Sequence, residues 1–578
     1  MILDRYLLSI LTWLPLLGAF CVLFFPRQAK RALVAMALGF MVLEAGISLK
    51  LLSGESASTA MRFVERVDWI PSLGIRYQLG VDGLSLWLVL LTTFVTPLAL
   101  LGSLGGVTTR LKEYCVAFLL LQTGMIGAFV ALDLFLFYVF WELMLVPMYL
   151  LIGVFGGQDR IRAALKFFLY TFAGSVLMLV AILYTVVQYE AVAGRMTFDL
   201  LELNQLELPM GTQQVLFIAF ALAFAVKVPM FPLHTWLPDA HTEAPTGGSV
   251  ILAAVLLKLG CYGFLRFAIP LFPRAAYWAS PTLALIAVVG ILYGAFCAWA
   301  QRDVKRLVAY SSVSHLGFVM LGIFTMNPAA VSGAILQMIN HGISTGALFL
   351  LVGVIYDRRH TRDLGEFGGL ATPMPAYATV FVIATMSSIG LPGTNGFVGE
   401  FMILSGTFLS DLGGGFINTN VPWRRLLAAL GGLGVLLGAV YMLHVVLKMF
   451  WGPVWNKKNA ELRDLSAREL VTLLPLVAAI FVLGFYPKLV LDDVQPTVTA
   501  YVRSFQSRLA QTWVADAKEA RLLTPPPAGG LARPTGDAPT GEGAAGGGAP
   551  SAGGGTPSGQ PREVRVRPPR IEVGGGAP

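Results

Sequence analysis

Fourteen long apolar runs divide most of this chain, and each is long enough to form a helix that crosses a lipid bilayer. A spanning helix needs about 20 apolar residues. The runs occupy residues 6–25, 32–53, 81–103, 113–131, 134–155, 164–188, 212–230, 247–268, 277–299, 306–325, 331–355, 374–409, 427–451 and 469–489. Charged residues make up 13% of the chain, against about 25% in an ordinary soluble domain. We therefore predict an all-α polytopic membrane protein with about 14 transmembrane helices.

Basic residues are distributed unequally between the two sets of loops. The loops after odd-numbered helices carry eighteen Lys and Arg residues, and the other set carries nine. The richer side is expected to be cytoplasmic, so both termini should face the opposite side. The first run lacks a basic leader and a cleavage site, so it is interpreted as a retained helix.

Two of the apolar runs are interrupted at matching positions. The seventh ends at residues 227–232 (KVPMFP), and the twelfth contains residues 390–396 (GLPGTNG). The first break follows the start of helix four by 117 residues, and the second follows the start of helix nine by 116. Paired broken helices are typical of inverted repeats that surround a transport site. We therefore expect two inverted five-helix repeats, helices 4–8 and 9–13, although proline kinks that only help packing are the alternative.

The expected organisation has five parts. They are residues 1–112 with helices 1–3, 113–268 with the first repeat, 277–451 with the second repeat, 469–489 with helix 14, and 525–578 as a tail. The tail is rich in Gly, Pro and Ala and cannot bury apolar surface, so it is expected to be disordered.

Four ionisable residues stand out among those inside or at the ends of the predicted spans: Glu142, Lys227, Lys258 and Glu400. An ionised side chain at mid-membrane costs roughly 2.5–3.5 kcal/mol, so such residues are usually paired or functional. Lys258 lies too deep in helix eight to reach an interface by snorkelling. These residues predict a buried proton path, whereas a static ion pair remains the alternative for Glu142.

His315 and His341 lie in predicted helices ten and eleven. A histidine titrates near neutral pH and can pass protons between neighbours. The two residues are candidates for a relay that connects Lys258 with Glu400 across the membrane plane. The alternative is that each is a buried side chain with satisfied hydrogen bonds.

Sites for metals, nucleotides and nucleic acids are not expected. The four cysteines lie in or beside apolar runs without a metal-binding spacing, and no nucleotide-binding glycine motif is present. His234, Asp239, His241 and Glu243 follow helix seven, where three prolines and a missing helical period favour a water-filled loop over a zinc site. We predict no cofactor in this chain.

The sequence of residues 227–253, KVPMFPLHTWLPDAHTEAPTGGSVILA, closely resembles the antiporter-like subunits of respiratory complex I. Trp141-Glu142 and the sequence LPGT at 391–394 fit the same family, and the match covers roughly residues 1–490. The resemblance implies a proton channel with Glu142 and Lys227 as a modulating pair, Lys258 as the central relay and Glu400 on the exit side. The chain also ends soon after helix fourteen, without the long lateral helix of one other subunit of this family.

The same resemblance implies the partners and the location. Other membrane subunits of complex I, especially the two other antiporter-like chains, would surround this chain in a bacterial inner membrane, with both termini on the periplasmic side. Partner subunits would bind NADH, FMN, iron–sulfur clusters and quinone. This chain would then be a subunit of a translocase and would carry out no redox chemistry itself. The alternatives are a subunit of a multi-subunit cation/proton antiporter, a subunit of a membrane-bound energy-converting hydrogenase, and a purely structural scaffold.

Overall fold

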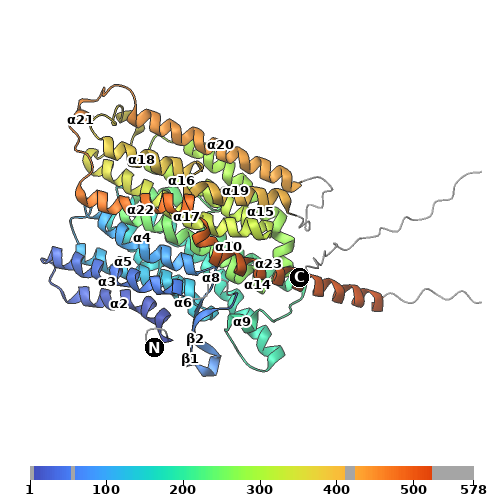
Figure 1. The fold of residues 1–578 in the computed structure, drawn as a ribbon. Helices are drawn as coiled ribbons and strands as arrows, with labels where there is room; N and C mark the ends of the chain where they lie inside the picture. Colours follow the sequence, from blue (N-terminus) through green and yellow to red (C-terminus); the bar gives the residue numbers. More distant parts are fainter. Residues whose placement is uncertain (1–4, 54–58, 411–422, 524–578) are drawn as a thin grey trace, which may run out of the picture. The chain divides into compact units, whose positions relative to one another are not determined.

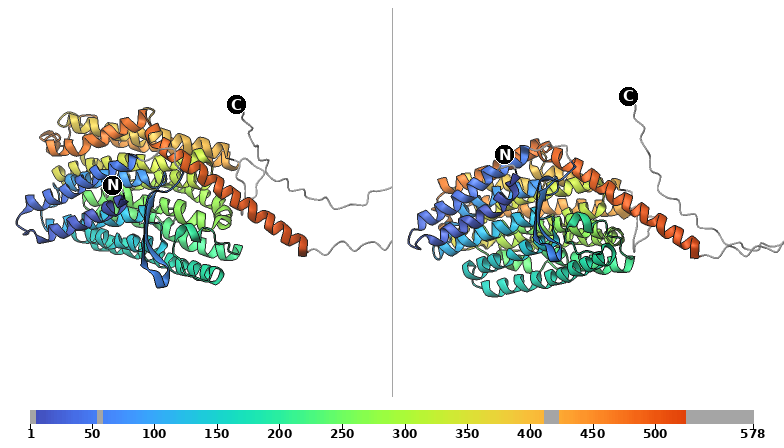
Figure 2. Two further views of the ribbon diagram at one scale, coloured as in Figure 1. Left: turned by 60° about the horizontal axis from the view of Figure 1, so that its bottom comes forward. Right: turned by 90° about the horizontal axis from the view of Figure 1, so that it is seen from below.

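The computed structural model describes residues 5–53, 59–410 and 423–523, so the predicted tail at 525–578 lies outside the described residues. Thirteen helical spans in these ranges are long and apolar enough to cross a membrane, and they run side by side (Figures 1 and 2). They are α2 (Leu7–Phe24), α3 (Lys30–Ser48) with η1 (Leu49–Ser53), α4 (Leu86–Ser103), α5 (Leu111–Val130), α6 (Leu134–Leu143) with α7 (Leu145–Phe155), α8 (Arg160–Ala193), α10 (Met210–Lys227), α12 (Thr246–Ile251) through α13 (Leu257–Gly263) to α14 (Ile269–Leu271), α15 (Pro273–Trp299), α16 (Val304–Thr325), α17 (Pro328–Arg359), α20 (Trp423–Phe450) and α22 (Ala467–Phe485). The predicted membrane helices are confirmed.

The predicted twelfth span is divided into two shorter helices, as its sequence indicated. These are α18 (Pro375–Ser388) and α19 (Asn395–Leu409). Between them Gly390 adopts a φ of +71°, which side chains other than glycine rarely adopt. A Cβ at Gly390 would also come within 2.9 Å of the Glu400 carboxylate. The break therefore needs glycine where the chain passes the Glu400 side chain.

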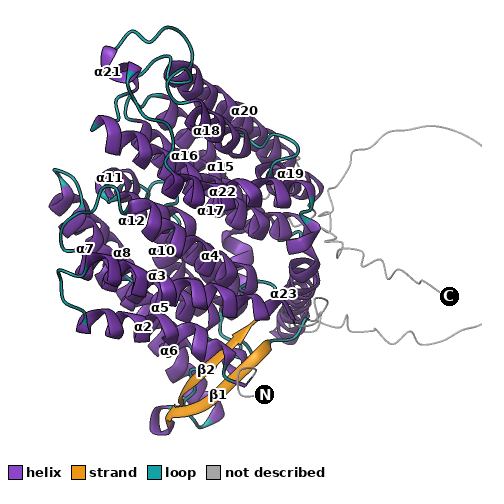
Figure 3. Ribbon diagram, turned by 60° about the vertical axis from the view of Figure 1, so that its left-hand side comes forward, coloured by secondary structure: helices purple, strands orange, loops and turns teal. Residues whose placement is uncertain are grey.

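A β-hairpin interrupts the otherwise helical architecture. β1 (Arg62–Ile70) pairs antiparallel with β2 (Ile75–Val81), and η2 (Pro71–Leu73) lies between them. Figure 3 shows these strands and α21 (Lys457–Ala460) at opposite edges of the helical bundle. The predicted third span starts at residue 81, whereas residues 75–81 pair with β1 and α4 begins only at Leu86. The all-α prediction is thus correct for the spans and incomplete for this hairpin.

Four shorter or amphipathic helices complete the described part of the chain. They are α9 (Leu200–Leu203), α11 (Trp236–Glu243), α21 and α23 (Lys488–Leu523), and η5 (Leu364–Glu366) lies between α17 and α18. The prediction of a loop after helix seven was wrong at α11, where the proline at position 238 lies in the first turn, a position that a helix tolerates.

A long helix also follows the last span, and it was not predicted from the sequence. α23 has 36 residues, but its mean hydropathy is too low for a membrane span. Its buried apolar side chains recur every three or four residues, which is the spacing of one helical face. They are Val490, Val494, Val498, Val502, Phe505 and Leu509. A search for long apolar runs misses a helix that is apolar on one face only.

Two pairs of aspartates occupy similar positions in the two halves of the chain. Asp133 caps the start of α6 and forms an isolated antiparallel bridge with Asp199, which caps α9. Asp303 caps the start of α16 and forms the same kind of bridge with Asp363, which caps η5. An aspartate at a helix start accepts hydrogen bonds from backbone N–H groups that have no partner within the helix. Both halves therefore anchor a connection to the start of a spanning helix in the same way.

Asp133 predicts a pH-dependent contribution to stability. Burial raises the pKa of Asp133 from 3.8 to about 6, although backbone N–H groups of Leu136, Arg76 and Phe135 donate to it and oppose the shift. Because the folded state holds this proton more tightly than the unfolded state, the contribution is greatest below pH about 4 and is lost as the pH rises to about 6. The melting temperatures of the wild type and D133N should differ, and this difference should change by a few degrees over this pH interval. D303N changes a capping aspartate in the same way and is the matched control. A melting-temperature difference between the wild type and D133N that does not depend on pH would contradict the prediction.

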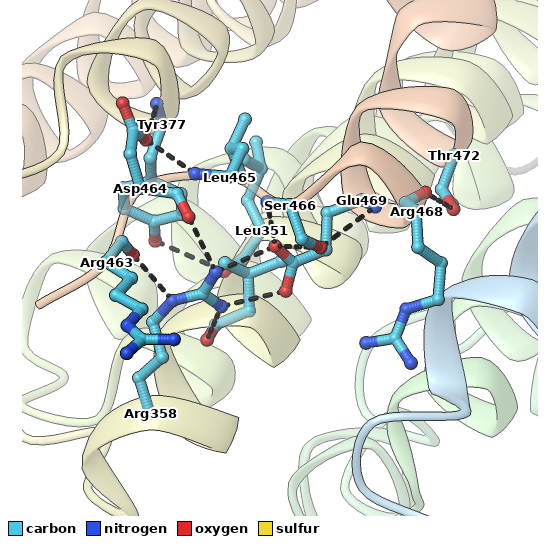
Figure 4. Close-up of polar contacts among 11 residues, drawn as sticks. Leu351, Arg358, Tyr377, Arg463, Asp464, Leu465, Ser466, Arg468, Glu469 and Thr472 are labelled. Atoms are coloured by element: carbon cyan, nitrogen blue, oxygen red, sulfur yellow. Dashed lines mark hydrogen bonds and ion pairs between the residues drawn. The ribbon is translucent and has the colours of Figure 1, made fainter.

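The end of α17 is held by an arginine that uses all of its donor groups. Arg358 donates to both carboxylate oxygens of Glu469 at 2.8 and 2.7 Å and to the carbonyl oxygens of Arg463 and Asp464 (Figure 4). Glu469 also completes a capping box with Ser466 at the start of α22. The Asp464 side chain accepts from the backbone N–H groups at the start of α18. These contacts fix α17, α18 and α22 to one another at this end.

Candidate functional site: a buried series of ionisable side chains

Glu142 and Lys227 lie on neighbouring elements of the first half. Glu142 is half-buried near the end of α6, and its Oε1 has no hydrogen-bond partner. Lys227 is the last residue of α10 and is 2% exposed. The two groups interact electrostatically, but they form no direct ion pair in the described structure. In the described structure the two side chains therefore interact through space, without direct contact.

Aromatic rings surround the Lys227 ammonium group. Its Nζ lies 5.0 Å from the centre of the Trp141 ring and 5.8 Å from the centre of the Phe167 ring. A cation is attracted to the face of an aromatic ring within about 6 Å, and more strongly where water is excluded. The Trp236 indole donates to the Val226 carbonyl at 2.9 Å and so ties α11 to the end of α10. The ammonium is thus held by ring faces at a helix end that favours positive charge.

Lys258 is fully buried in the centre of the eighth span. This span contains two π-helical segments, η3 (Leu252–Leu256) and η4 (Phe264–Ala268), on either side of α13. π-Helical turns are rare and occur often at functional sites. Lys258 Nζ donates to the Ala253 carbonyl in η3 and lies 2.7 Å from Nδ1 of His341 on α17. Lysine and histidine are therefore in direct hydrogen-bonding contact.

The series continues from His341 to the second broken helix. The His341 ring lies 5.7 Å from the ring of His315 on α16, measured between centroids. His315 Nδ1 lies 3.2 Å from Glu400 Oε1, and its Nε2 lies 3.2 Å from the Ser388 hydroxyl. Glu400 is in the second turn of α19 and is 5% exposed. The structure thus brings Lys258, His341, His315 and Glu400 into one series, with the two histidines between Lys258 and Glu400.

One junction in this series lacks a direct hydrogen bond. His341 Nε2 is buried and has no partner in the described structure. His341 and His315 contact each other edge to face, so a proton passing between them needs a ring rotation or a bridging water. Between Lys227 and Lys258 the described side chains form no direct contact, although α10 packs against α13.

Several polar residues of the site were missed in the sequence. Gln337 donates to Glu400 Oε1 at 3.0 Å, and Asn340 donates to the Asn395 carbonyl at 2.6 Å. Asn395 also accepts from Ser387 and so connects both sides of the helix break. Gln337, Asn340 and His341 lie on one face of α17, because residues three and four apart are neighbours on a helix. That spacing inside an apolar run was the signal that could have identified them.

The residues considered for zinc binding are not gathered at one point. Asp239 pairs with Lys166 at 2.7 Å and with Arg306 at 3.5 Å. Glu243 accepts from the backbone N–H of Asp159, whereas His241 stacks on Phe349 with ring centroids 4.6 Å apart. Within residues 5–53, 59–410 and 423–523, no group of three potential ligands has metal-binding geometry.

Comparisons with known proteins agree with this architecture. A family model described as "NADH:quinone oxidoreductase/Mrp antiporter, TM" matches residues 131–419. NADH-quinone oxidoreductase subunit M of Rhodobacter capsulatus is 48% identical over 87% of this chain and 98% of its own length. NADH-ubiquinone oxidoreductase chain 4 of Marchantia polymorpha is 40% identical over 86% of this chain and 97% of its own length. A chain of respiratory complex I from Thermus thermophilus superposes with a TM-score of 0.76 at 32% identity, over 86% of this chain and 99% of that chain.

Three sequence features had favoured chain M among the antiporter-like subunits. They are the sequence TEAPTGGS at 242–249, the lysine at 258 in helix eight, and Glu400 where the related chains L and N are expected to carry lysine. The named relatives confirm this interpretation. This chain belongs to the family of NADH-quinone oxidoreductase subunit M.

Proposed function

We propose that this chain translocates protons as a membrane subunit of a proton-pumping NADH-quinone oxidoreductase. The observation that carries the proposal is the buried series Lys258, His341, His315 and Glu400. Its direct contacts measure 2.7 Å at one end and 3.2 Å at the other. A purely structural role does not require four titratable groups in contact inside a membrane, where each is costly.

Each member of the series has a distinct role in the proposal. The Lys258 ammonium donates a proton to His341 Nδ1, and the two histidines pass it toward Glu400 by ring rotation or through a bridging water. Gln337 and Ser388 position Glu400 and His315 through hydrogen bonds. Glu400 receives the proton beside the second break, where unpaired backbone groups can hold water.

Glu142 and Lys227 form the control element of the proposed path. Charge on Glu142 stabilises the ammonium form of Lys227, since their attraction is strong where water is excluded. Protonating the carboxylate or moving it away weakens this attraction and favours proton release from Lys227. The aromatic rings of Trp141 and Phe167 keep the ammonium in position during this change.

The two halves are proposed to be inverted repeats at residues 113–268 and 277–451. The paired bridges Asp133–Asp199 and Asp303–Asp363 support this division. Each half also contains one broken helix with an ionisable residue beside the break, Lys227 in the first and Glu400 in the second. Five spans separate the two capped helix starts, and an odd number of spans reverses their direction.

The chain's surroundings follow from the same proposal. NADH oxidation, FMN, iron–sulfur clusters and quinone reduction are assigned to partner subunits, and the other antiporter-like chains are the proposed membrane neighbours. The basic loops are placed on the cytoplasmic side of a bacterial inner membrane, with both termini on the periplasmic side.

Alanine replacement of the control pair tests the proposal. In the assembled complex, E142A and K227A should each lower proton translocation about tenfold or more, because a positioned proton-transfer group contributes roughly 10²–10⁴-fold. Proton uptake by inverted membrane vesicles is the measurement. E461A and K458A are matched controls, since both side chains are exposed. Normal assembly with unchanged proton translocation in E142A and K227A would rule the mechanism out.

A further inference from the structure

A further carboxyl lies deep inside the membrane part of the chain, away from the proposed path. Glu44 is on α3, in a helix that is otherwise apolar between Ala32 and Ile47, and its side chain is 0% exposed. α3 packs against α2, α4 and α5. Glu44 was not predicted as a path residue, because it lies outside the two expected repeats.

Glu44 has one hydrogen-bond partner in the described structure. Gln122 on α5 donates from Nε2 to Glu44 Oε2 at 2.7 Å. The other carboxyl oxygen, Glu44 Oε1, and the amide oxygen, Gln122 Oε1, are both buried without a partner. Both of these atoms are acceptors as long as the carboxyl is ionised. The pair therefore lacks one donor.

A proton on Glu44 supplies the missing donor. The neutral acid can donate from Oε1 to Gln122 Oε1 while Gln122 donates to Oε2, so that acid and amide bond each other twice. An ionised Glu44 would instead be a buried charge without a counter-ion, since no charged side chain among the described residues contributes to its electrostatic surroundings. Isolated buried charges are strongly unfavourable. Geometry and solvation thus favour the same protonated form.

The pair is separate from the proposed proton path. One turn further along α3, the Ser48 hydroxyl lies 2.8 Å from the Thr93 hydroxyl on α4. Thr123, next to Gln122, has a buried hydroxyl without a partner. In the described structure, no direct hydrogen bond leads from Glu44 to the Lys258 series.

We propose that Glu44 is a second proton-binding site in the membrane, a neutral carboxylic acid paired with Gln122, and that it is open to covalent modification by hydrophobic carbodiimides. Such reagents react with protonated carboxyls in apolar surroundings. The acid proton moves to a carbodiimide nitrogen while the carboxylate oxygen bonds to the central carbon, and the adduct rearranges to a stable N-acylurea. Nothing leaves, so the peptide gains the whole mass of the reagent.

The outer face of α3 offers an approach for an apolar reagent. Val42 and Leu43, next to Glu44 in sequence, are 60% and 53% exposed. A Cβ atom at Gly39 would have no neighbouring atom within 4 Å, so the surface beside Gly39 is open. The outer face of α3 is thus open to an apolar reagent from the lipid.

Peptide mass spectrometry locates the modification. Cleavage after Arg31 and Lys50 releases residues 32–50, and Glu44 is the only carboxylic side chain in this peptide. After treatment of membranes that contain the whole complex with dicyclohexylcarbodiimide, we expect this peptide to gain one reagent mass in the wild type and in E461Q. The adduct should be lost in E44Q, whose amide cannot react.

Infrared spectroscopy tests the protonated form without any need for reagent access. The difference between the wild-type and E44Q complexes should contain one C=O band of a protonated carboxylic acid that shifts in D2O. An absent acid band overturns the proposal. An acid band in the infrared spectrum without a reagent adduct on the peptide would support proton binding by Glu44 and overturn the proposed modification. Both results are independent of whether E142A or K227A affects pumping.

Discussion

Replacing Lys258 with methionine should lower proton translocation about tenfold or more, because a positioned proton-transfer group contributes roughly 10²–10⁴-fold. The substitution keeps the length of the side chain but removes the proton donor that contacts His341 at 2.7 Å. Proton movement into inverted vesicles after NADH addition is the measurement, with the amount of assembled complex determined in the same membranes. K458M is the matched control at an exposed lysine.

The arginine variant at the same position separates two roles of Lys258. Arginine keeps the positive charge but does not release its proton in proteins. If Lys258 only balances charge, K258R should pump almost normally. The proposed relay requires the lysine to lose and regain a proton, so K258R should be as defective as K258M. Wild-type pumping in K258R would contradict the relay.

Replacing Arg266 with methionine should destabilise the chain by about 3–5 kcal/mol, the cost of leaving one partner of a buried ion pair uncompensated. Arg266 and Asp82 are 7% and 4% exposed and form a direct ion pair. Arg266 also donates to the Tyr262 hydroxyl at 3.0 Å, and this hydroxyl donates to the Phe129 carbonyl at 2.9 Å. The group thus joins the end of the eighth span to α5 and to the turn before α4.

Thermal unfolding of the purified complex and the yield of assembled chain measure this effect. R503M is the control, since Arg503 is exposed. The double variant D82L/R266M should recover much of the loss, because it removes the unpaired charge as well as its partner. Equal stability of R266M and the wild type would contradict the interpretation, as would a double variant that is no better than R266M.

Hydropathy and charge in the sequence were sufficient to predict the spans and the central residues of the site. A lysine in the middle of an apolar run, such as Lys258, has few structural explanations, and two broken helices at matching intervals indicated where Glu400 lies. Glu142 and Lys227 were expected to act as a pair on the strength of the family resemblance. Their interaction through space without a direct ion pair depends on side-chain packing around Trp141, which no single sequence reveals.

Other features were missed because they depend on contacts between distant segments. The β-hairpin forms where residues 75–81 pair with residues 62–70. The π-helical turns beside Lys258 change the hydrogen-bond register without a distinctive composition. Gln337 and Glu44 are single polar residues in apolar helices, and their importance becomes visible only when Glu400 and Gln122 are seen next to them.

The number of protons translocated for each NADH oxidised, measured in liposomes that contain the complex with H341L, tests the central claim most directly. Leucine fills much of the space of His341 but cannot accept a proton from Lys258 or pass one to His315. The proposed relay predicts a lower ratio of protons to NADH in H341L than in the wild type, at equal amounts of assembled complex. An unchanged ratio would show that protons do not pass from Lys258 through His341 to Glu400.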